Sequence, residues 1–406
     1  MKAHVVIVGA GQAGGRTAQA LRRLGHTGLV TLVGEESLPP YERPPLSKDV
    51  LLGRADASSL LLMAKDGWRE LDVELRCSTR VKKIDRGARR MTLVDGSELS
   101  FDVLVLATGA RPRAYPGIVE ANTELLYLRN IDDALRLAPR LLQGHHVAII
   151  GAGFIGLEVA STARTLGADV TLVEAAPRLL ARLLPAAFAL EQLAVHRAHG
   201  VEVLLDRAVE RIAPGRIYLT DGRVVEADTI VIGIGARAND ELAVAAGLAT
   251  HDGVVVDAAG RSSDPGIYAV GDVARYRDAA TGIEHRLESW RNAEDSAQTV
   301  AASILGRPTA RAPVPWFWTD QYGRNIQIAG RPDDGHRCIV KGGEDEEPSL
   351  TYYLDASQRL CGVIAVDSAR ELRRVMKLIE TRDPVDVEAL PAPRPRVRSL
   401  AEVVPS

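Results

Sequence analysis

Two copies of one glycine-rich pattern constrain what this chain can fold into. Residues 5–14 read VVIVGAGQAG, and residues 147–156 read VAIIGAGFIG. In each copy a short apolar run, typical of a buried strand, leads into Gly-x-Gly-x-x-Gly. Each copy continues with a Leu-Gly pair and a second apolar run. In the first copy these lie at 24–25 and 30–33, and in the second copy at 166–167 and 170–173. The repeat predicts two βαβ units.

Each glycine of this fingerprint has its own physical task. The first makes a tight turn, the second lets the backbone approach a pyrophosphate, and the third lets the helix pack closely on the strand. A single match would be weak evidence, because glycine-rich turns occur in many loops. Here each copy follows a strand, opens a helix and precedes an acid, Glu35 or Glu174. We therefore predict two dinucleotide sites, with the phosphates at the N-termini of helices.

The acid of the second copy bears on which nicotinamide nucleotide is used. A carboxylate after the second strand accepts hydrogen bonds from ribose hydroxyls and repels a 2′-phosphate. Glu174 therefore favours NADH over NADPH. Arg178 and Arg182 follow it closely, and arginines in this loop can instead accommodate the phosphate. We expect NADH and keep this alternative open.

Two further apolar strands bracket the second unit, at 104–106 and 230–232, and each leads into a glycine turn. This order indicates that the first unit is interrupted near residue 110 and resumed near residue 238. The predicted fold class is α/β, with two Rossmann-like dinucleotide-binding domains, the second inserted in the first, and a C-terminal α+β domain. The predicted domains are 1–110 with 238–312, 111–237, and 313–406.

Composition excludes several classes of protein. The net charge is only −3, so no strong attraction to nucleic acid follows. No apolar run approaches the roughly 20 residues that span a bilayer, and the start of the chain does not resemble a secretory signal. The three cysteines form no Cys-x-x-Cys and are expected to be buried free thiols in the cytoplasm. We expect no metal site, since the His145–His146 pair has no further ligand at suitable spacing.

Several strings carry a family resemblance. The Ala-Thr-Gly segment at 107–109, the inserted second fingerprint and the pair Gly271–Asp272 together resemble the two-dinucleotide flavin reductases of the glutathione-reductase-like fold. More narrowly, 43–48 (RPPLSK), 153–158 (GFIGLE) and 315–321 (PWFWTDQ) are similar to the FAD-dependent NADH:ferredoxin reductases of bacterial cytochrome P450 and aromatic-ring dioxygenase systems. The resemblance implies that the first domain binds FAD and the inserted domain binds NAD.

The resemblance also implies residue roles. Asp272 would bind the ribityl chain of FAD and Glu35 its adenosine ribose, while Lys48 would lie near the reactive flavin edge, paired with Glu158. The implied FAD residues are Gly9, Gly11, Ala13, Gly14, Glu35, Arg43, Lys48, Val81, Arg129, Asp272, Trp290 and Trp318. The implied NAD residues are Gly151, Gly153, Phe154, Ile155, Gly156, Glu158, Glu174, Arg182 and Gly235.

Hydride transfer from nicotinamide to flavin needs stacked rings and close approach, but no catalytic acid or base. The missing Cys-x-x-Cys argues against a disulfide reductase of this fold. The resemblance then implies an NADH-dependent ferredoxin reductase that passes single electrons to a [2Fe-2S] ferredoxin, as a monomer or weak dimer without nucleic-acid or membrane partners. An NADH oxidase or rubredoxin-type reductase stays open, as does a redox-sensing flavoprotein of the apoptosis-inducing-factor branch.

The remaining predictions concern local structure. A last parallel strand is expected at 267–274, ending in an acid that points at a ligand. In the C-terminal domain we expect strands at 352–354 and 360–366 and an amphipathic helix at 368–380. The acidic run 344–347 is expected to be a solvated loop, and 391–406 to be ordered in part at most.

Overall fold

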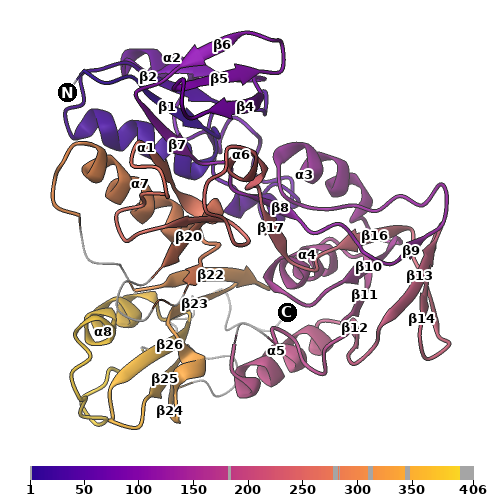
Figure 1. Ribbon diagram of the computed structural model, residues 1–406. Helices are drawn as coiled ribbons and strands as arrows, with labels where there is room; N and C mark the ends of the chain where they lie inside the picture. The colour runs from indigo at the N-terminus through magenta and orange to yellow at the C-terminus, as the bar shows by residue number, and fades with distance from the viewer. Residues whose placement is uncertain are drawn as a thin grey trace.

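The structure, a computed structural model, describes residues 2–181, 184–277, 282, 284–309, 314–342 and 348–393. Its first sheet, at the top of Figure 1, has five parallel strands in the order β19-β7-β1-β2-β3. Their bounds are Ile267–Ala269, Val103–Leu106, Val5–Val8, Val30–Val33 and Glu74–Arg76. The strand predictions at 5–8 and 30–33 are confirmed.

A second parallel sheet repeats this arrangement in the order β12-β11-β10-β16. Its strands are Val201–Leu204, Asp169–Val173, His146–Ile150 and Thr229–Ile232. The inner strands of both sheets are buried on both faces and are almost wholly apolar, whereas the edge strands β3 and β12 carry exposed charged residues. A separate sheet in the order β15-β14-β13-β9 extends to the right of Figure 1, with strands Val224–Glu226, Arg216–Leu219, Val209–Ala213 and Ile118–Val119.

The two predicted helices after the glycine turns are present. They are α1 (Gln12–Arg23) and α4 (Phe154–Thr165). The third glycine of each fingerprint packs helix against turn: a Cβ on Gly14 would lie 1.9 Å from the Gly9 carbonyl oxygen, and one on Gly156 would lie 2.1 Å from that of Gly151. These contacts leave no room for a side chain. The helix α7 (Trp290–Ile304) packs along α1.

A two-stranded antiparallel ribbon carries the chain between the two parallel sheets. It consists of β8 (Ala110–Pro112) and β17 (Ala236–Ala238), with Arg111 opposite Arg237. The chain leaves the first sheet along β8, builds the second sheet, and returns along β17. The interruption predicted near residues 110 and 238 therefore coincides with this ribbon.

The last part of the chain forms an antiparallel sheet in the order β22-β23-β26-β25-β24, with α8 (Ala369–Thr381) on it (Figure 1). The strands are Trp316–Gln321, Arg324–Gly330, Leu360–Val366, Ser349–Leu354 and Arg337–Gly342. The strand predicted at 360–366 is confirmed, the one at 352–354 is longer than predicted, and the helix begins one residue later than predicted.

Two predictions were wrong. The strand expected at 267–274 ends at Ala269, because Gly271 has φ +69° and residues 271–273 form the 3₁₀ turn η3 (Gly271–Val273). The chain then enters another sheet in the order β18-β20-β21, with strands Val254–Val256, Ala274–Arg277 and Glu284–Arg286. The cysteines were expected to be buried, but Cys338 is exposed, because it lies on the edge strand β24. Cys77 and Cys361 are half-buried.

The other elements complete the chain. The helices are α2 (Lys65–Glu70), α3 (Ile131–Leu137), α5 (Ala186–Ala198) and α6 (Glu241–Ala245), with 3₁₀ turns η1 (Pro44–Ser47), η2 (Ala138–Arg140) and η4 (Pro332–Asp334). The strands are β4 (Val81–Asp85), β5 (Arg90–Leu93) and β6 (Glu98–Ser100).

Within the described ranges, no helix combines the length and apolar character needed to cross a bilayer. The acidic run predicted as a loop at 344–347 and most of the segment 391–406 lie outside the described residues.

Gly14→Ala tests the close packing of helix and turn. The new Cβ would meet the Gly9 carbonyl, so we expect the thermal unfolding midpoint to fall by about 5 °C or more. Gly87→Ala is the control, since its Cβ would be 3.5 Å from the nearest atom, Asp85 Oδ1. Equal midpoints for the two variants, measured by calorimetry, would contradict the packing argument.

Candidate functional site

One cavity of about 2790 Å³ opens at the carboxyl ends of both parallel sheets. Single-ligand pockets are usually about 300–1,000 Å³, so this cavity has room for more than one ligand. The predicted site residues that line it are Gly9, Gly11, Ala13, Glu35, Arg43, Lys48, Val81, Arg129, Asp272, Trp290 and Trp318 from the first set, and Gly151, Gly153, Phe154, Ile155, Glu158, Glu174 and Gly235 from the second.

Two of the described predicted residues are not part of the lining. Gly14 and Gly156 lie behind the turns, where they allow helix and turn to pack. Arg182 lies outside the described residues.

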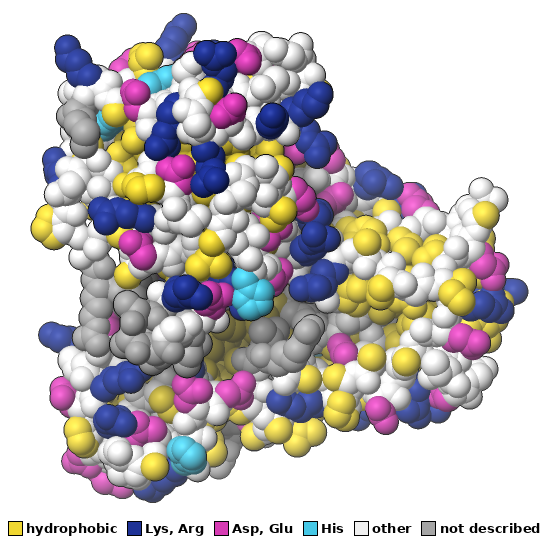
Figure 2. Space-filling model, in the orientation of Figure 1, with side chains coloured by type: hydrophobic (Ala, Val, Ile, Leu, Met, Phe, Trp, Pro, Cys, Tyr) yellow, Lys and Arg dark blue, Asp and Glu magenta, His cyan; other side chains and the backbone are white. Residues whose placement is uncertain are grey.

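On one face of the molecule, hydrophobic side chains gather over the region where Figure 1 draws α4, β10 and β16 (Figure 2).

The first glycines form two matching cradles. Gly9 has φ +115°, and a Cβ there would lie 2.1 Å from the Ala107 carbonyl oxygen; Gly151 has φ +106°, and a Cβ there would lie 2.5 Å from that of Gly233. A Cβ on Gly11 would meet only Arg43 Nη2, at 3.7 Å. The backbone at Gly11 is therefore open to the cavity at the start of α1, where free N–H groups favour an anion.

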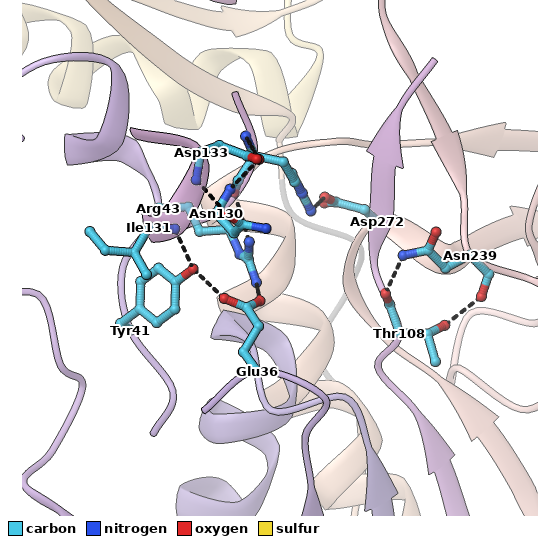
Figure 3. A network of polar contacts seen from close by, with 10 residues as sticks. Glu36, Tyr41, Arg43, Thr108, Asn130, Ile131, Asp133, Asn239 and Asp272 are labelled. Carbon is cyan, nitrogen blue, oxygen red and sulfur yellow. Dashed lines mark hydrogen bonds and ion pairs between the residues drawn. The ribbon is translucent and has the colours of Figure 1, made fainter. Parts of the chain in front are cut away.

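Glu35, the acid predicted after β2, is more exposed to solvent than the adjacent Glu36. Its side chain is 67% exposed and pairs with Arg80 at 3.3 Å. Glu36 accepts hydrogen bonds from Tyr41 and Arg43 (Figure 3). Sequence reasoning missed Glu36, although the two acids are adjacent. Both line the cavity.

Arg43, Arg129 and Asp272 form a polar network in the lining of the cavity, and Figure 3 labels Arg43 and Asp272. Arg43 Nη1 donates to the Arg129 carbonyl oxygen at 2.7 Å, and Arg129 Nη2 pairs with Asp272 Oδ2 at 2.8 Å. The Arg129 backbone N–H is held at 2.9 Å by Asp133, in the capping box of α3. Three predicted residues from distant parts of the chain are thus brought together.

Sequence reasoning also missed a pair of hydrogen bonds between the two segments that connect the parallel sheets. The Thr108 hydroxyl donates to the Asn239 carbonyl oxygen at 2.6 Å, and the Asn239 side-chain amide donates to the Thr108 carbonyl oxygen at 2.8 Å (Figure 3). Thr108 belongs to the Ala-Thr-Gly segment. No spacing rule pairs it with an asparagine so far along the chain.

The expected pair of Lys48 with Glu158 is present. Lys48 Nζ lies 3.0 Å from Glu158 Oε1, and the glutamate is only 4% exposed. The Ser47 hydroxyl donates to Glu158 Oε2, and the Thr319 hydroxyl donates to Oε1 at 2.7 Å. A carboxylate taken out of water is stable only with such partners. Asp320 adds a weaker contact, 4.0 Å from Lys48.

Three tryptophans stand beside this pair. Trp318 lies edge-on to Trp290, with ring centroids 5.8 Å apart, and stacks on Trp316 at 5.2 Å. All three line the cavity. The Trp290 indole N–H is buried and has no hydrogen-bond partner among the described residues. A buried donor without a partner costs free energy, so this one is suited to a ligand.

Glu174 is fixed against the second cradle. Its carboxylate accepts from the backbone N–H of Ala152 at 2.7 Å and of Ala176 at 2.8 Å. Arg178 donates to the backbone carbonyls of Ala181 and Leu184 instead of facing this carboxylate. The guanidinium of Arg178 is thus engaged by backbone carbonyls of its own loop.

Comparisons with known proteins agree with this geometry. Residues 3–297 match the family model described as pyridine nucleotide-disulphide oxidoreductase, and residues 316–401 match the reductase C-terminal model. The chain is 39% identical to the ferredoxin–NAD(+) reductase component of the anthranilate 1,2-dioxygenase system of Burkholderia cepacia, over 96% of this chain and 97% of that protein. It is 37% identical to the corresponding component of the p-cumate 2,3-dioxygenase system of Pseudomonas putida, over 98% of each.

A solved structure, that of the covalent putidaredoxin reductase–putidaredoxin complex, shares the fold with a TM-score of 0.90. The identity is 35%, and the alignment covers 96% of this chain and 95% of that one.

The buried pair can be tested by a double-mutant cycle. Lys48→Met leaves the Glu158 carboxylate without its cation, and we expect it to lower the free energy of unfolding by about 3 kcal/mol. In a Glu158→Gln background the same change should cost less, giving a coupling of about 1–3 kcal/mol. The measurement is urea unfolding of the protein without added nucleotide.

Lys83→Met serves as the control, because Lys83 is an exposed lysine on β4. We expect its effect to stay within about 0.5 kcal/mol. A coupling of zero between Lys48 and Glu158 would mean that the pair adds nothing to the stability of the fold.

Proposed function

The chain belongs to the pyridine nucleotide-disulphide oxidoreductase family, and we propose that it is an FAD-dependent reductase that takes a hydride from NADH and delivers single electrons to a [2Fe-2S] ferredoxin. The observation that carries the proposal is one cavity into which two glycine cradles open. Such a cavity lets two dinucleotides lie with their reactive ends together, and bound FAD would supply the hydride and electron chemistry.

The residues around the first cradle fit FAD. The open backbone at Gly11 suits its pyrophosphate. The side chain of Asp272 offers acceptors to ribityl hydroxyls, and the indole N–H of Trp290 is an unused donor. Lys48 would place a cation at the flavin edge. We propose the first predicted set for FAD and the second for NADH, with domain boundaries at 1–110 with 238–312, 111–237, and 313–406.

The cysteines favour an acceptor outside the chain. Cys77, Cys338 and Cys361 are free, and none is among the described residues that line the cavity. A disulfide reductase of this fold needs a redox-active pair beside the flavin. The names of the relatives supply the acceptor class, a ferredoxin. Free thiols also support our proposal that the protein works in the cytoplasm.

The proposal predicts a yellow purified protein whose flavin absorbance bleaches on mixing with NADH in a stopped-flow instrument. Cytochrome c reduction by the reductase with NADH should rise at least about tenfold when [2Fe-2S] ferredoxins of P450 and dioxygenase systems are added. Ferredoxin without reductase is the control. Rapid NADH-dependent oxygen consumption with no effect of any ferredoxin would favour an oxidase and overturn the acceptor assignment.

Nucleotide preference gives a separate prediction. A 2′-phosphate beside the Glu174 carboxylate would be repelled, so we expect NADH to reduce the flavin with a kcat/KM at least about a hundredfold above that of NADPH. Glu174→Ser should narrow this ratio, mainly by improving NADPH.

Glu210→Ser, which removes an exposed acid from β13 in the same part of the chain, should leave the ratio unchanged. A wild-type preference for NADPH would show that the carboxylate of Glu174 does not select against the phosphate.

A further inference from the structure

A continuous chain of hydrogen bonds leads away from Glu158 through the protein interior. Beyond Thr319, which bonds Glu158, the Gln321 amide nitrogen lies 3.0 Å from the Thr319 hydroxyl. The Gln321 oxygen lies 2.8 Å from His196 Nε2, and His196 Nδ1 lies 3.0 Å from the Tyr322 hydroxyl. Thr319, Gln321 and His196 are all buried. Such a chain satisfies polar groups that would otherwise be costly.

Elementary chemistry fixes the direction of every bond. As the carboxylate partner of Lys48, Glu158 only accepts, so the Thr319 hydroxyl donates to it. The Thr319 oxygen then accepts from the Gln321 amide, which turns the Gln321 oxygen toward His196. That oxygen needs a donor, so Nε2 of His196 carries the proton, and Nδ1 is left to accept from Tyr322. Every donor in the chain thus points toward Glu158.

The environment of the histidine agrees with this assignment. Burial lowers the pKa of His196 to about 4, so the ring is neutral near pH 7 and has one donor and one acceptor nitrogen. Burial also raises the pKa of the Tyr322 hydroxyl, which therefore stays a donor. His199 stacks on the Tyr322 ring at 3.7 Å, and the Tyr322 backbone N–H is held by Ser161 at 2.8 Å.

The chain of hydrogen bonds passes back and forth between two structural units. Glu158 and Ser161 lie on α4 and His196 on α5, both in the inserted unit, whereas Thr319, Gln321 and Tyr322 lie on or directly after the C-terminal strand β22. Lys48 comes from the first unit, next to η1. The orientation of one carboxylate is thus set by three parts of the protein.

We propose that Gln321, His196 and Tyr322 are positioning residues that act through Thr319 to hold the Glu158 carboxylate in the orientation in which it pairs with Lys48. None of the three lines the cavity, and the chain of hydrogen bonds through Thr319 links them to the Glu158 carboxylate. The consequence for flavin reduction rests on the proposed function, whereas the hydrogen-bond directions do not.

The first test measures directly which ring nitrogen of His196 carries the proton. Protein labelled with ¹⁵N-histidine is examined by NMR at pH 7.5, with His196 assigned by its loss in His196→Gln. We expect a neutral ring protonated at Nε2 with a hydrogen-bonded Nδ1, and we expect Tyr322→Phe to shift the Nδ1 resonance toward that of an unbonded nitrogen. A ring protonated at Nδ1, or an Nδ1 signal unmoved by Tyr322→Phe, would overturn the proposal.

The second test measures the effect of the chain of hydrogen bonds on the rate of flavin reduction. Gln321→Met keeps the side-chain length but removes both hydrogen bonds, and we expect the limiting rate of flavin bleaching by NADH to fall about tenfold with the NADH Kd unchanged. Gln192→Met is the matched control: Gln192 is also buried, on α5, and takes no part in the hydrogen bonds that link Tyr322 to Glu158. The control should change the rate less than twofold.

Equal slowing in both methionine variants would assign the effect to packing and refute the positioning role. If Gln321→Met does not fold, Tyr322→Phe removes only the terminal hydroxyl and should still slow bleaching about twofold to threefold; an unchanged rate refutes the role. Failure of every ferredoxin as acceptor would overturn the proposed function alone, since both readouts here precede electron transfer to a partner.

Discussion

The arrangement of this molecule depends on a charge that is almost fully removed from water. Isolated in the interior, the Glu158 carboxylate would cost several kcal/mol. It is tolerated because a cation and two hydroxyls reach it from outside its own helix: Lys48 and Ser47 from the loop at η1, and Thr319 from β22. Each unit therefore supplies part of the solvation of one group. A displacement of either the first unit or the C-terminal unit would remove some of the partners of this carboxylate.

The glycine turns explain why this charge lies in the cavity that both turns line. In both units the strand ends, the chain turns with a positive φ at Gly9 or Gly151, and the helix begins directly afterwards. Glu158 lies only one turn inside α4, so its position follows from that of the second cradle. The acid and the glycine turn proposed to bind a phosphate are thus parts of one local structure.

Much of this could be predicted from the sequence, because the relevant signals are local. A run of apolar residues followed by closely spaced glycines determines strand, turn and helix with little help from distant residues, and the strands at 5–8 and 30–33 were predicted with their observed bounds. The Lys48–Glu158 pair was predicted as well, but from a family resemblance and not from spacing.

What the sequence did not reveal depends on tertiary contacts. Glu36 and Glu35 are chemically equivalent neighbours, and only the positions of Tyr41 and Arg43 distinguish them. The bonds between Thr108 and Asn239, and the chain through Gln321, join residues far apart in sequence. The strand predicted to continue past Ala269 failed because the left-handed backbone of Gly271 cannot be read from apolar patterning.

The ribbon of β8 and β17 has a consequence for how such a protein can change over time. Because Ala110 and Ala238 face each other across two paired strands, the inserted segment leaves and re-enters the first unit at a single place. An inserted segment whose two ends are adjacent can be replaced by another segment without changing the strands of the domain that contains it. Under the proposed assignment of FAD to the first unit and NADH to the inserted unit, this ribbon would let the specificity for the electron donor evolve separately from the fold that receives the electrons.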